Sequence, residues 1–308
     1  MNENALAYGV DVGGTTIKLG LFDSYGSLLR RDSIPTDTGD HGAHILPQIA
    51  RWIRRQDIPL SQLSGVGLGV PGPVRKDGTV NRCVNLGWGV VPVAEVLSGL
   101  LDGVPVRVAN DANAAALGEC WQGAGREMDS LLLVTLGTGV GGGLVLHGDV
   151  LAGAHGSARE IGNMTVNPDE TQPCSCGKRG CLEQYASAGG IVRMAQAGRL
   201  RVESAKDVSD LAQLGHQDAQ GELKEAGRLL GLALSYAACL VDVDGILIGG
   251  GVAAAGRFLL NAVRDTFDDS VFHAAADTIL EFASLGNDAG LYGAARLVWN
   301  GQSDTTSL

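Results

Sequence analysis

Three of the chain's six cysteines, Cys174, Cys176 and Cys181, stand within eight residues. Glycines at 177 and 180 allow the backbone to turn between them. Thiols this close in the chain can converge on one soft metal ion, for which zinc is the first choice. A disulfide or a chance grouping of thiols would not account for the glycines, so the pattern favours a metal site.

A carboxylate beside a glycine turn marks a second candidate site. Asp11 lies at the end of a short apolar strand, Tyr8–Val12, and the turn Gly13-Gly14-Thr15 follows it. A carboxylate there can hold a hydrated magnesium ion, while the N–H and hydroxyl groups of the turn meet phosphate oxygens. An Asx turn is the ordinary alternative for such an aspartate.

Two more glycine clusters follow predicted strands. The turn Gly137-Thr138-Gly139 would be the partner of the first turn on the other side of a nucleotide. Gly249–Gly251 would let a base or a ribose approach the backbone closely. One such cluster is weak evidence, whereas three at strand ends in one chain are considerably stronger.

Asp111 admits two interpretations. It follows Asn110 at the end of a predicted strand, Val104–Ala109, where a helix begins at about Ala112. As a structural residue it would cap that helix alongside Asn110. As a functional residue it would accept a hydroxyl proton while that oxygen attacks phosphorus, and the helix N-terminus favours its ionised form. The local sequence does not separate the two.

The elements that position these residues include two similar sets. A strand, a Gly/Thr turn and a second strand occupy residues 8–22 and again residues 131–146. This repetition predicts a duplicated architecture whose two halves face a cleft. Both turns join a strand to a strand, whereas dinucleotide folds and P-loops run from a strand through glycines into a helix, so those two folds are disfavoured.

Strands and helices alternate through the rest of the chain, which predicts a mainly α/β protein. From Leu223 to Leu240, small or apolar residues recur at three- and four-residue steps, which predicts one long helix with a buried stripe. Further expected helices span residues 43–55, 93–101, 189–197, 208–214, 261–267 and 291–299, and further strands span 66–70 and 244–252.

Composition and charge exclude some classes of function. With 34 acidic against 23 basic residues the net charge is −11, which argues against a nucleic-acid partner and against an anionic membrane surface. The longest apolar stretch, residues 131–146, is too short to span a bilayer, and no signal peptide is apparent. Cys83, Cys120 and Cys239 stand alone, which suits a reducing compartment, so we expect a cytoplasmic protein.

A series of motifs in order resembles one protein family, from about residue 8 to about residue 295. The motifs are DVGGT at 11–15, VPGP at 70–73, NLGW at 85–88, NDANAA at 110–115, LGTGVGGG at 136–143 and CSCGKRGCLE at 174–183. With these motifs the sequence resembles the ROK family of sugar kinases and sugar-responsive repressors, and most of all its bacterial glucokinases.

The resemblance implies an actin-like, ribonuclease-H-like α/β fold with two lobes around a cleft for ATP and a hexose. We expect residues 1–115 with 291–308 to form the small lobe, and residues 116–290 the large lobe with the cysteine-rich loop. Asp111 would be the base that activates the primary hydroxyl of the sugar. The residues expected to hydrogen-bond the sugar are Asn85, Asn110, Asp111, Glu160, Asn163 and Glu183. Those expected to hold magnesium, the phosphates and the adenosine are Asp11, Gly13, Gly14, Thr15, Thr138, Gly139, Gly249 and Gly250.

One stretch departs from the family pattern. The family has Glu-x-Gly-His there, and that histidine both ligates zinc and touches the sugar. This chain has Glu160-Ile161-Gly162-Asn163, and an Asn amide is a much poorer zinc ligand than imidazole. Arg159, where the family usually has glycine, also places a cation beside Glu160. Three thiolates would then hold zinc with water or His155 as the fourth ligand, or the metal is lost, or catalysis is impaired.

These observations lead to the expectation of an ATP-dependent hexokinase that phosphorylates the 6-hydroxyl of glucose and, like its family, forms homodimers. The alternatives are a kinase for mannose, fructose, allose or an N-acetylhexosamine, the use of polyphosphate as donor, and a sugar-binding protein without catalysis. A transcriptional regulator of the family is less consistent with the sequence, because we expect no helix-turn-helix domain ahead of the DVGG motif.

Overall fold

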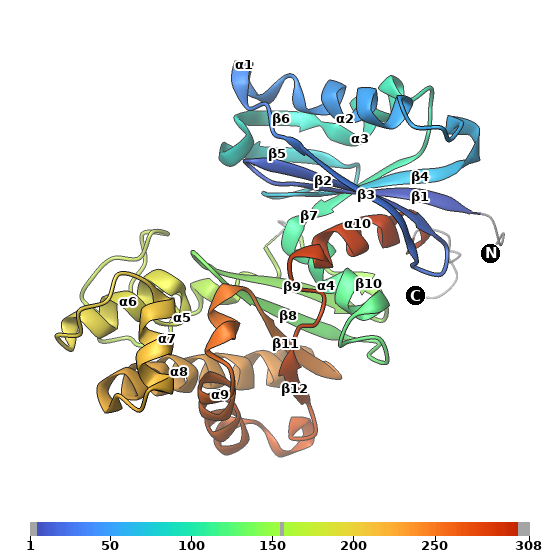
Figure 1. Ribbon diagram of the computed structural model, residues 1–308. Coiled ribbons are helices and arrows are strands. Elements are labelled where there is room, and N and C mark those ends of the chain that lie inside the picture. Colours follow the sequence, from blue (N-terminus) through green and yellow to red (C-terminus); the bar gives the residue numbers. More distant parts are fainter. Residues whose placement is uncertain (1–4, 155–156, 301–308) are drawn as a thin grey trace. The chain divides into compact units, whose positions relative to one another are not determined.

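The computed structural model describes residues 5–154 and 157–300 (Figure 1). The chain folds into two compact units: unit 1 comprises residues 1–129, 143–158 and 287–308, and unit 2 comprises residues 130–142 and 159–286. Strands and helices alternate in the chain, so the predicted α/β class is confirmed. The lobe bounds expected from the sequence stay a prediction. Within the described residues, no helix is long and apolar enough to cross a membrane.

Unit 1 is built on a five-stranded sheet in the order β3-β2-β1-β4-β7. The first three strands pair antiparallel, and β4 and β7 join them in parallel. The strands of this sheet are β1 (Leu6–Val12), β2 (Thr16–Asp23), β3 (Leu28–Pro35), β4 (Leu63–Val70) and β7 (Val106–Asn110). A separate antiparallel pair consists of β5 (Thr79–Cys83) and β6 (Trp88–Pro92).

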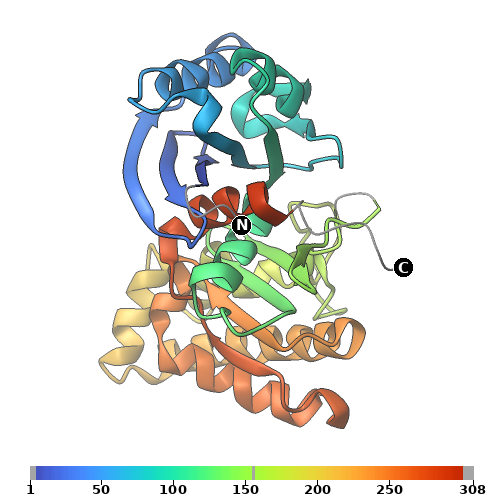
Figure 2. The same ribbon diagram turned by 90° about the vertical axis from the view of Figure 1, so that its right-hand side faces the viewer.

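Helices cover both faces of this sheet. Successive strand residues point to opposite sides, and both sides carry buried apolar residues that pack against helices. Tyr8 belongs to the same buried cluster as Ile49 and Leu97, whereas its neighbour Ala7 packs with Leu291. Both views show the blue α2 and the teal α3 on one face and the red α10 on the other (Figure 1, Figure 2). The helices of unit 1 are α1 (Gly39–Gly42), α2 (Ile45–Arg54), α3 (Val93–Leu100), α4 (Asp111–Gln122) and α10 (Ala289–Asn300).

The second sheet repeats the plan of the first. Its order is β10-β9-β8-β11-β12, so both sheets arrange their strands as third, second, first, fourth and fifth along the chain. In both, the fourth strand pairs in parallel with the first and the fifth. This topology confirms the predicted duplication. The strands are β8 (Leu131–Leu136), β9 (Val140–Leu146), β10 (Asp149–Val150), β11 (Gly245–Gly249) and β12 (Ile279–Phe282).

Helices make up much of unit 2, which also contains β8, β11, β12 and the first residues of β9. They are α5 (Glu183–Ala186), α6 (Ala188–Ala197), α7 (Ala205–Gln213), α8 (Gln217–Val241) and α9 (Arg257–Ser270), with 3-10 turns at η3 (Ile161–Asn163) and η4 (Gly251–Ala255). The long helix α8 buries Leu223 and Leu230 as predicted, but Leu240 is 87% exposed, so the predicted end of the stripe is wrong. The residues of the predicted stripe are on average less than one helical turn of about 3.6 residues apart. Each successive residue is therefore rotated slightly around the helix axis, and the last one no longer lies on the buried face.

Glycines let α10 approach its neighbours in unit 1 closely. A Cβ atom on Gly293 would overlap the carbonyl group of Ala114 in α4. One on Gly67 of β4 would overlap the carbonyl group of Ala294 in α10. Because α4 begins at Asp111, this close packing determines where that carboxylate lies within unit 1.

Candidate active site

Asn110 and Asp111 stand where β7 ends and α4 begins. The Oδ1 atom of Asn110 accepts hydrogen bonds from the backbone N–H groups of Ala112 and Asn113, at 3.0 and 3.3 Å. Its Nδ2 atom donates to the carbonyl of Gly72 at 3.2 Å. Asn110 is therefore the N-cap residue of α4. Asp111, which the structural interpretation expected to cap the helix alongside Asn110, is instead the first residue of the helix. The half-buried Asp111 carboxylate accepts from the Ala112 N–H at 2.8 Å, at the positive end of the helix dipole.

The Cys83 thiol lies against the loop that carries Asn85. It is 3% exposed and ends β5, directly before the 3-10 turn η2 (Val84–Leu86). Burial raises the pKa of the thiol, hydrogen bonds from the N–H groups of Leu86 and Asn85 oppose that rise, and the charge of Asp111 adds to it. A Cβ atom on Gly72, whose carbonyl accepts from Asn110, would lie 3.4 Å from the Cβ atom of Cys83, so the loop that carries Asn85 packs near the start of α4.

Asp11 forms an ion pair with Lys18. The two residues are direct partners in the β1–β2 hairpin, and the Nζ atom of Lys18 lies 3.1 Å from Oδ2 of Asp11. Gly290, in the first turn of α10, leaves room for this carboxylate, since a Cβ atom there would lie 3.2 Å from its carboxyl carbon. The Asp11 side chain keeps 19% of its surface exposed, so it is held from two sides and still reaches solvent.

The turn at residues 13–15 lies beside the Asn85 loop. A hydrogen bond from the Gly13 N–H to the Thr16 carbonyl, at 3.0 Å, closes the turn. Gly14 and the threonine after it are exposed. A Cβ atom on Gly14 would lie 3.5 Å from the carbonyl oxygen of Asn85. Unit 1 thus brings the predicted phosphate turn next to a predicted sugar residue.

A groove of about 400 Å³ in unit 2 contains four of the predicted residues, Thr138, Gly139, Glu183 and Gly250. The turn that forms part of it is tight, with the Gly137 N–H donating to the Gly139 carbonyl at 2.9 Å. Backbone N–H groups around such a turn can meet phosphate oxygens. The complete lining is Thr135, Gly137, Thr138, Gly139, Val140, Gly141, Glu183 and Gly250.

The glycines at 249–251 differ in what they contact. β11 ends at Gly249, so the predicted strand over residues 244–252 is too long. The strand cannot continue because Gly250 has a φ of 87°, outside the extended region. A Cβ atom on Gly250 would overlap the backbone of Leu136, whereas nothing lies within 4 Å of one on Gly251. The fold itself therefore requires glycine at 250, and the open space lies at Gly251.

Glu183 borders the groove with both carboxylate oxygens engaged. Its Oε1 atom accepts a hydrogen bond from the hydroxyl of Ser175 at 2.9 Å, and its Oε2 atom accepts one from the N–H of Val140 at 3.2 Å. A side chain on Gly139 would overlap Oε2. The carboxylate is therefore fixed between the glycine turn and the cysteine loop.

Glu160 contacts the two residues that depart from the family pattern. The Nδ2 atom of Asn163 donates to Oε2 of Glu160 at 3.3 Å, and the Nη2 atom of Arg159 lies 3.9 Å from Oε1. The Arg159 side chain is 6% exposed, against 48% for Glu160. A Cβ atom on Gly162 would overlap the carbonyl of Val140, so the turn η3 packs against the start of β9. Val140 thus contacts Glu183 directly and packs against the turn that follows Glu160.

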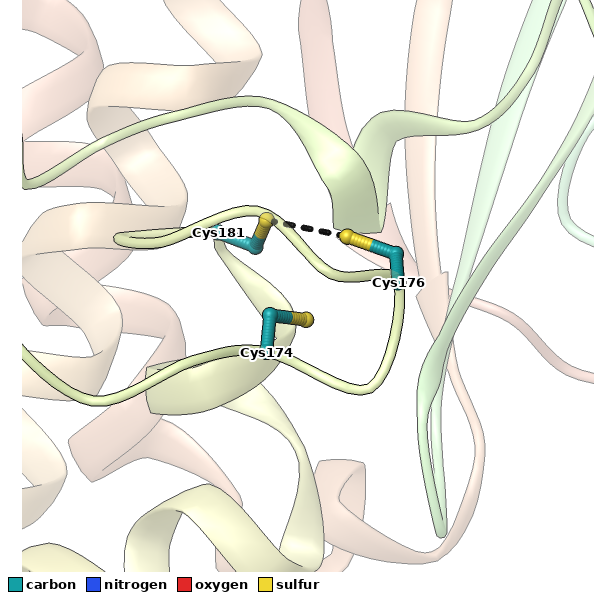
Figure 3. A group of neighbouring side chains, drawn as sticks. All are labelled: Cys174, Cys176 and Cys181. Atoms are coloured by element: carbon teal, nitrogen blue, oxygen red, sulfur yellow. Dashed lines mark hydrogen bonds between the residues drawn. The ribbon is translucent and has the colours of Figure 1, made fainter.

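The sulfur atoms of Cys174, Cys176 and Cys181 lie within 4.8 Å of one another (Figure 3). All six cysteines are free thiols, and the sulfurs of Cys176 and Cys181 are 3.6 Å apart. Burial acts to raise the pKa of Cys174, but hydrogen bonds, the strongest from the Cys176 N–H, outweigh it and lower this pKa. Burial and the neighbouring thiols raise the pKa of Cys181 to about 12.

This donor set fits a soft metal such as zinc, which accepts three thiolates and a fourth ligand. Among the described residues, the group of metal-binding side chains comprises these three thiols alone. The alternative fourth ligand, His155, lies outside the described residues. The side-chain amide nitrogen of Asn163 donates to Glu160, and the backbone carbonyl of Asn163 accepts from Lys178 of the cysteine loop at 2.9 Å.

The model of the ROK family matches residues 7–300. This chain belongs to the ROK family. It is similar to a glucokinase of Halalkalibacterium halodurans, at 41% identity over 94% of each chain. It is also similar to the structure of a ROK hexokinase from Thermus thermophilus, at 32% identity and a TM-score of 0.83, over 96% of this chain and 98% of the other. A ROK glucokinase from Streptomyces griseus, solved with glucose and AMPPNP, matches at 33% identity and a TM-score of 0.73, over 95% and 99%.

Membership of the ROK family confirms the predicted actin-like fold. Three residues of this ROK chain that contact the predicted site were missed in the sequence: Lys18, Cys83 and Ser175. Lys18 had a signal, because a hairpin closed at residues 13–15 places it opposite Asp11. Cys83 and Ser175 had none, since their contacts depend on how loops fold.

Proposed function

We propose that this ROK protein is an ATP-dependent hexokinase that phosphorylates the 6-hydroxyl of a hexose, with glucose as the first candidate. The observation that carries the proposal is Asp111, a carboxylate in the first residue of a helix, directly after the N-cap Asn110. The similarity to proteins named glucokinase and hexokinase supports it.

Unit 1 would supply the base and part of the sugar site. Asp111 would take the proton of the 6-hydroxyl while that oxygen attacks the γ-phosphorus of ATP. Asn85 and Asn110 would hydrogen-bond other hydroxyls of the sugar. Asp11 can offer a carboxylate oxygen to magnesium, which needs only one or two carboxylates besides phosphates, and Lys18 would hold that carboxylate in place. The ion would neutralise charge on the phosphates.

Unit 2 would supply the second phosphate turn and further hydroxyl contacts. Thr138 and Gly139 offer hydroxyl and backbone donors at an open groove of about 400 Å³. Gly249 and Gly250 would lie near the adenosine, and the exposed Gly251 is the glycine there with open space around it. The residues of this unit proposed to hydrogen-bond the sugar are Glu160, Asn163 and Glu183.

The proposed activity is tested by ADP release across a panel of glucose, mannose, fructose, allose and N-acetylated hexosamines. We expect ADP to form only when a sugar is present, and fastest with glucose. A parallel series with polyphosphate in place of ATP identifies the donor. The absence of sugar-dependent ADP release and of turnover with polyphosphate would rule the kinase out.

Arg159 and Asn163 favour one alternative, a sugar-binding protein with altered specificity or little catalysis. Both contact Glu160, where they compete with a sugar hydroxyl for its oxygens. Titration calorimetry with the same sugars separates the two proposals. A sugar that binds without any phosphoryl transfer would support the alternative.

We also propose that zinc occupies the cysteine cluster. We expect about one zinc per chain in wild-type protein, and well under half of that in Cys176→Ser, because a hydroxyl is a far poorer ligand than a thiolate. Elemental analysis of dialysed protein measures both. Cys239→Ser changes an exposed cysteine outside the cluster and serves as the control. Equal zinc in Cys176→Ser and wild type would contradict this assignment.

We propose a cytoplasmic homodimer as well. Tyr236 and Leu240, one helical turn apart in α8, are 49% and 87% exposed, which supports a surface buried in a partner. Light scattering of the wild type should give twice the mass of one chain. In Leu240→Asp the measured mass should fall toward that of a single chain. A monomeric wild type would contradict the dimer.

A further inference from the structure

We propose that Ser175 is a positioning residue through which the cysteine loop holds Glu183 in place for the sugar. The inference rests on the proposed function in one respect, namely that Glu183 binds a hexose hydroxyl. Its structural basis is the pair of hydrogen bonds to Glu183, from the Ser175 hydroxyl at 2.9 Å and from the Val140 N–H at 3.2 Å.

The two donors fix different oxygens of the same carboxylate. A glutamate side chain has several rotatable bonds and loses conformational freedom when it must adopt a single geometry for a ligand. Val140 begins β9 directly after the glycine turn and holds Oε2. Ser175, which lies in the cysteine loop and not in β9, donates a hydrogen bond to Oε1. With either donor removed, the carboxylate could rotate away from the position that the groove requires.

The place of the Ser175 hydroxyl is determined by the turn that also gathers the thiols. The N–H of Cys174 donates to the carbonyl of Lys178 at 2.7 Å, and the N–H of Gly177 donates to the carbonyl of Cys174 at 2.9 Å. The Sγ atom of Cys174 lies 3.7 Å from the Ser175 hydroxyl oxygen. Ser175 therefore stands inside a closed turn between two members of the cluster, Cys174 and Cys176. Whatever orders that turn also orders the donor to Glu183.

Ser175→Ala tests the role of the hydroxyl. We expect the KM for the hexose to rise about tenfold, because a hydrogen bond to a charged group is lost. The kcat and the KM for ATP should change by less than about twofold, since neither the base nor the nucleotide contacts are altered. The zinc content and the melting temperature should stay at the wild-type values. A hexose KM equal to that of wild type would overturn the proposal.

Two further variants separate positioning from general damage to the loop. Ser175→Thr keeps a hydroxyl at the same position and should retain a hexose KM within about threefold of wild type. Thr171→Ala removes a hydroxyl from an exposed position in the same segment and should leave every kinetic constant unchanged. If Ser175→Thr is as defective as Ser175→Ala, the hydroxyl is not the cause and the proposal fails.

A double-mutant cycle tests whether the loop acts on Glu183 through Ser175. Cys176→Ser loosens the cluster and should raise the hexose KM by itself. In the double variant Ser175→Ala with Cys176→Ser, the second change should add less than about twofold, because the connection is already broken. Multiplied effects would show that the cluster and Ser175 act independently, which overturns the coupling.

Failure of the kinase proposal can be told apart from failure of this inference. If wild type transfers no phosphoryl group but binds hexose in calorimetry, the same variants are compared by their dissociation constants, with the same expected ratios. If Ser175→Ala matches wild type in a protein that phosphorylates hexose, only the inference on Ser175 falls. If wild type binds no hexose, both fall together.

Discussion

Asp111→Asn is expected to lower kcat for hexose phosphorylation by about 10³-fold. The amide keeps the size and shape of the carboxylate and can still accept the hydrogen bond that the Ala112 N–H now donates at 2.8 Å. It cannot take a proton from the sugar hydroxyl, so general base catalysis is lost. ADP release with saturating sugar and ATP measures the change.

The fold of the variant should remain intact, because Asn110 is the cap that holds the start of α4. The melting temperature and the hexose KM should stay close to wild type, which separates lost chemistry from lost binding. Asp269→Asn, an exposed aspartate in α9, is the matched control and should keep full activity. An Asp111→Asn variant with more than about a tenth of wild-type kcat would exclude Asp111 as the base.

Gly293→Ala is expected to lower the free energy of unfolding by about 2–3 kcal/mol. The new methyl group would overlap the Ala114 carbonyl and come within 2.8 Å of the Gly118 backbone nitrogen, and neither backbone group can move aside without shifting α4. Because α4 carries Asp111 at its first residue, kcat should fall as well. Urea unfolding and ADP release measure the two effects.

Gly99→Ala provides the matched control within unit 1. Gly99 also lies inside a helix, α3, but nothing approaches within 4 Å of a Cβ atom built there. Alanine should therefore stabilise the protein by about 0.5–1 kcal/mol, since it limits the unfolded chain more than glycine does. If Gly293→Ala and Gly99→Ala unfold at the same urea concentration, the close packing of α4 and α10 does not contribute to stability as described.

Much of the fold was predictable because buried residues follow the period of their element. The two Gly/Thr hairpins were recognised from their order, and the sheets share one strand order. β3 was missed because six of its eight residues are exposed on the edge of a sheet, so no apolar alternation marks it. The end of the α8 stripe was wrong because helical drift accumulates with length, and Leu240 stands at the far end.

The residue types of the candidate site were predictable, but their partners were less so. The cluster of three cysteines needed only short sequence spacing, and the structure brings the three sulfurs together. Which of Asn110 and Asp111 caps the helix depends on backbone dihedral angles that the local sequence does not determine. The donors to Glu183 come from residues 8 and 43 positions away in the chain, and no periodic pattern links such positions.

The departure at Asn163 has a structural consequence in this chain. The residue that replaces the family histidine donates to Glu160, and Arg159 approaches the other oxygen of the same carboxylate. Two donors to one carboxylate reduce its freedom, much as Ser175 and Val140 do for Glu183. Glu160 therefore has side-chain partners of its own, separate from the three thiols.

Identification of the reaction product tests the central proposal most directly. Wild-type protein is incubated with ATP, magnesium and ¹³C-labelled glucose, and the products are followed by ¹³C and ³¹P NMR. We expect a phosphomonoester on carbon 6 of glucose, formed in step with ADP and absent with Asp111→Asn. ADP without phosphorylated sugar, or a phosphate on another hydroxyl of glucose, would contradict it.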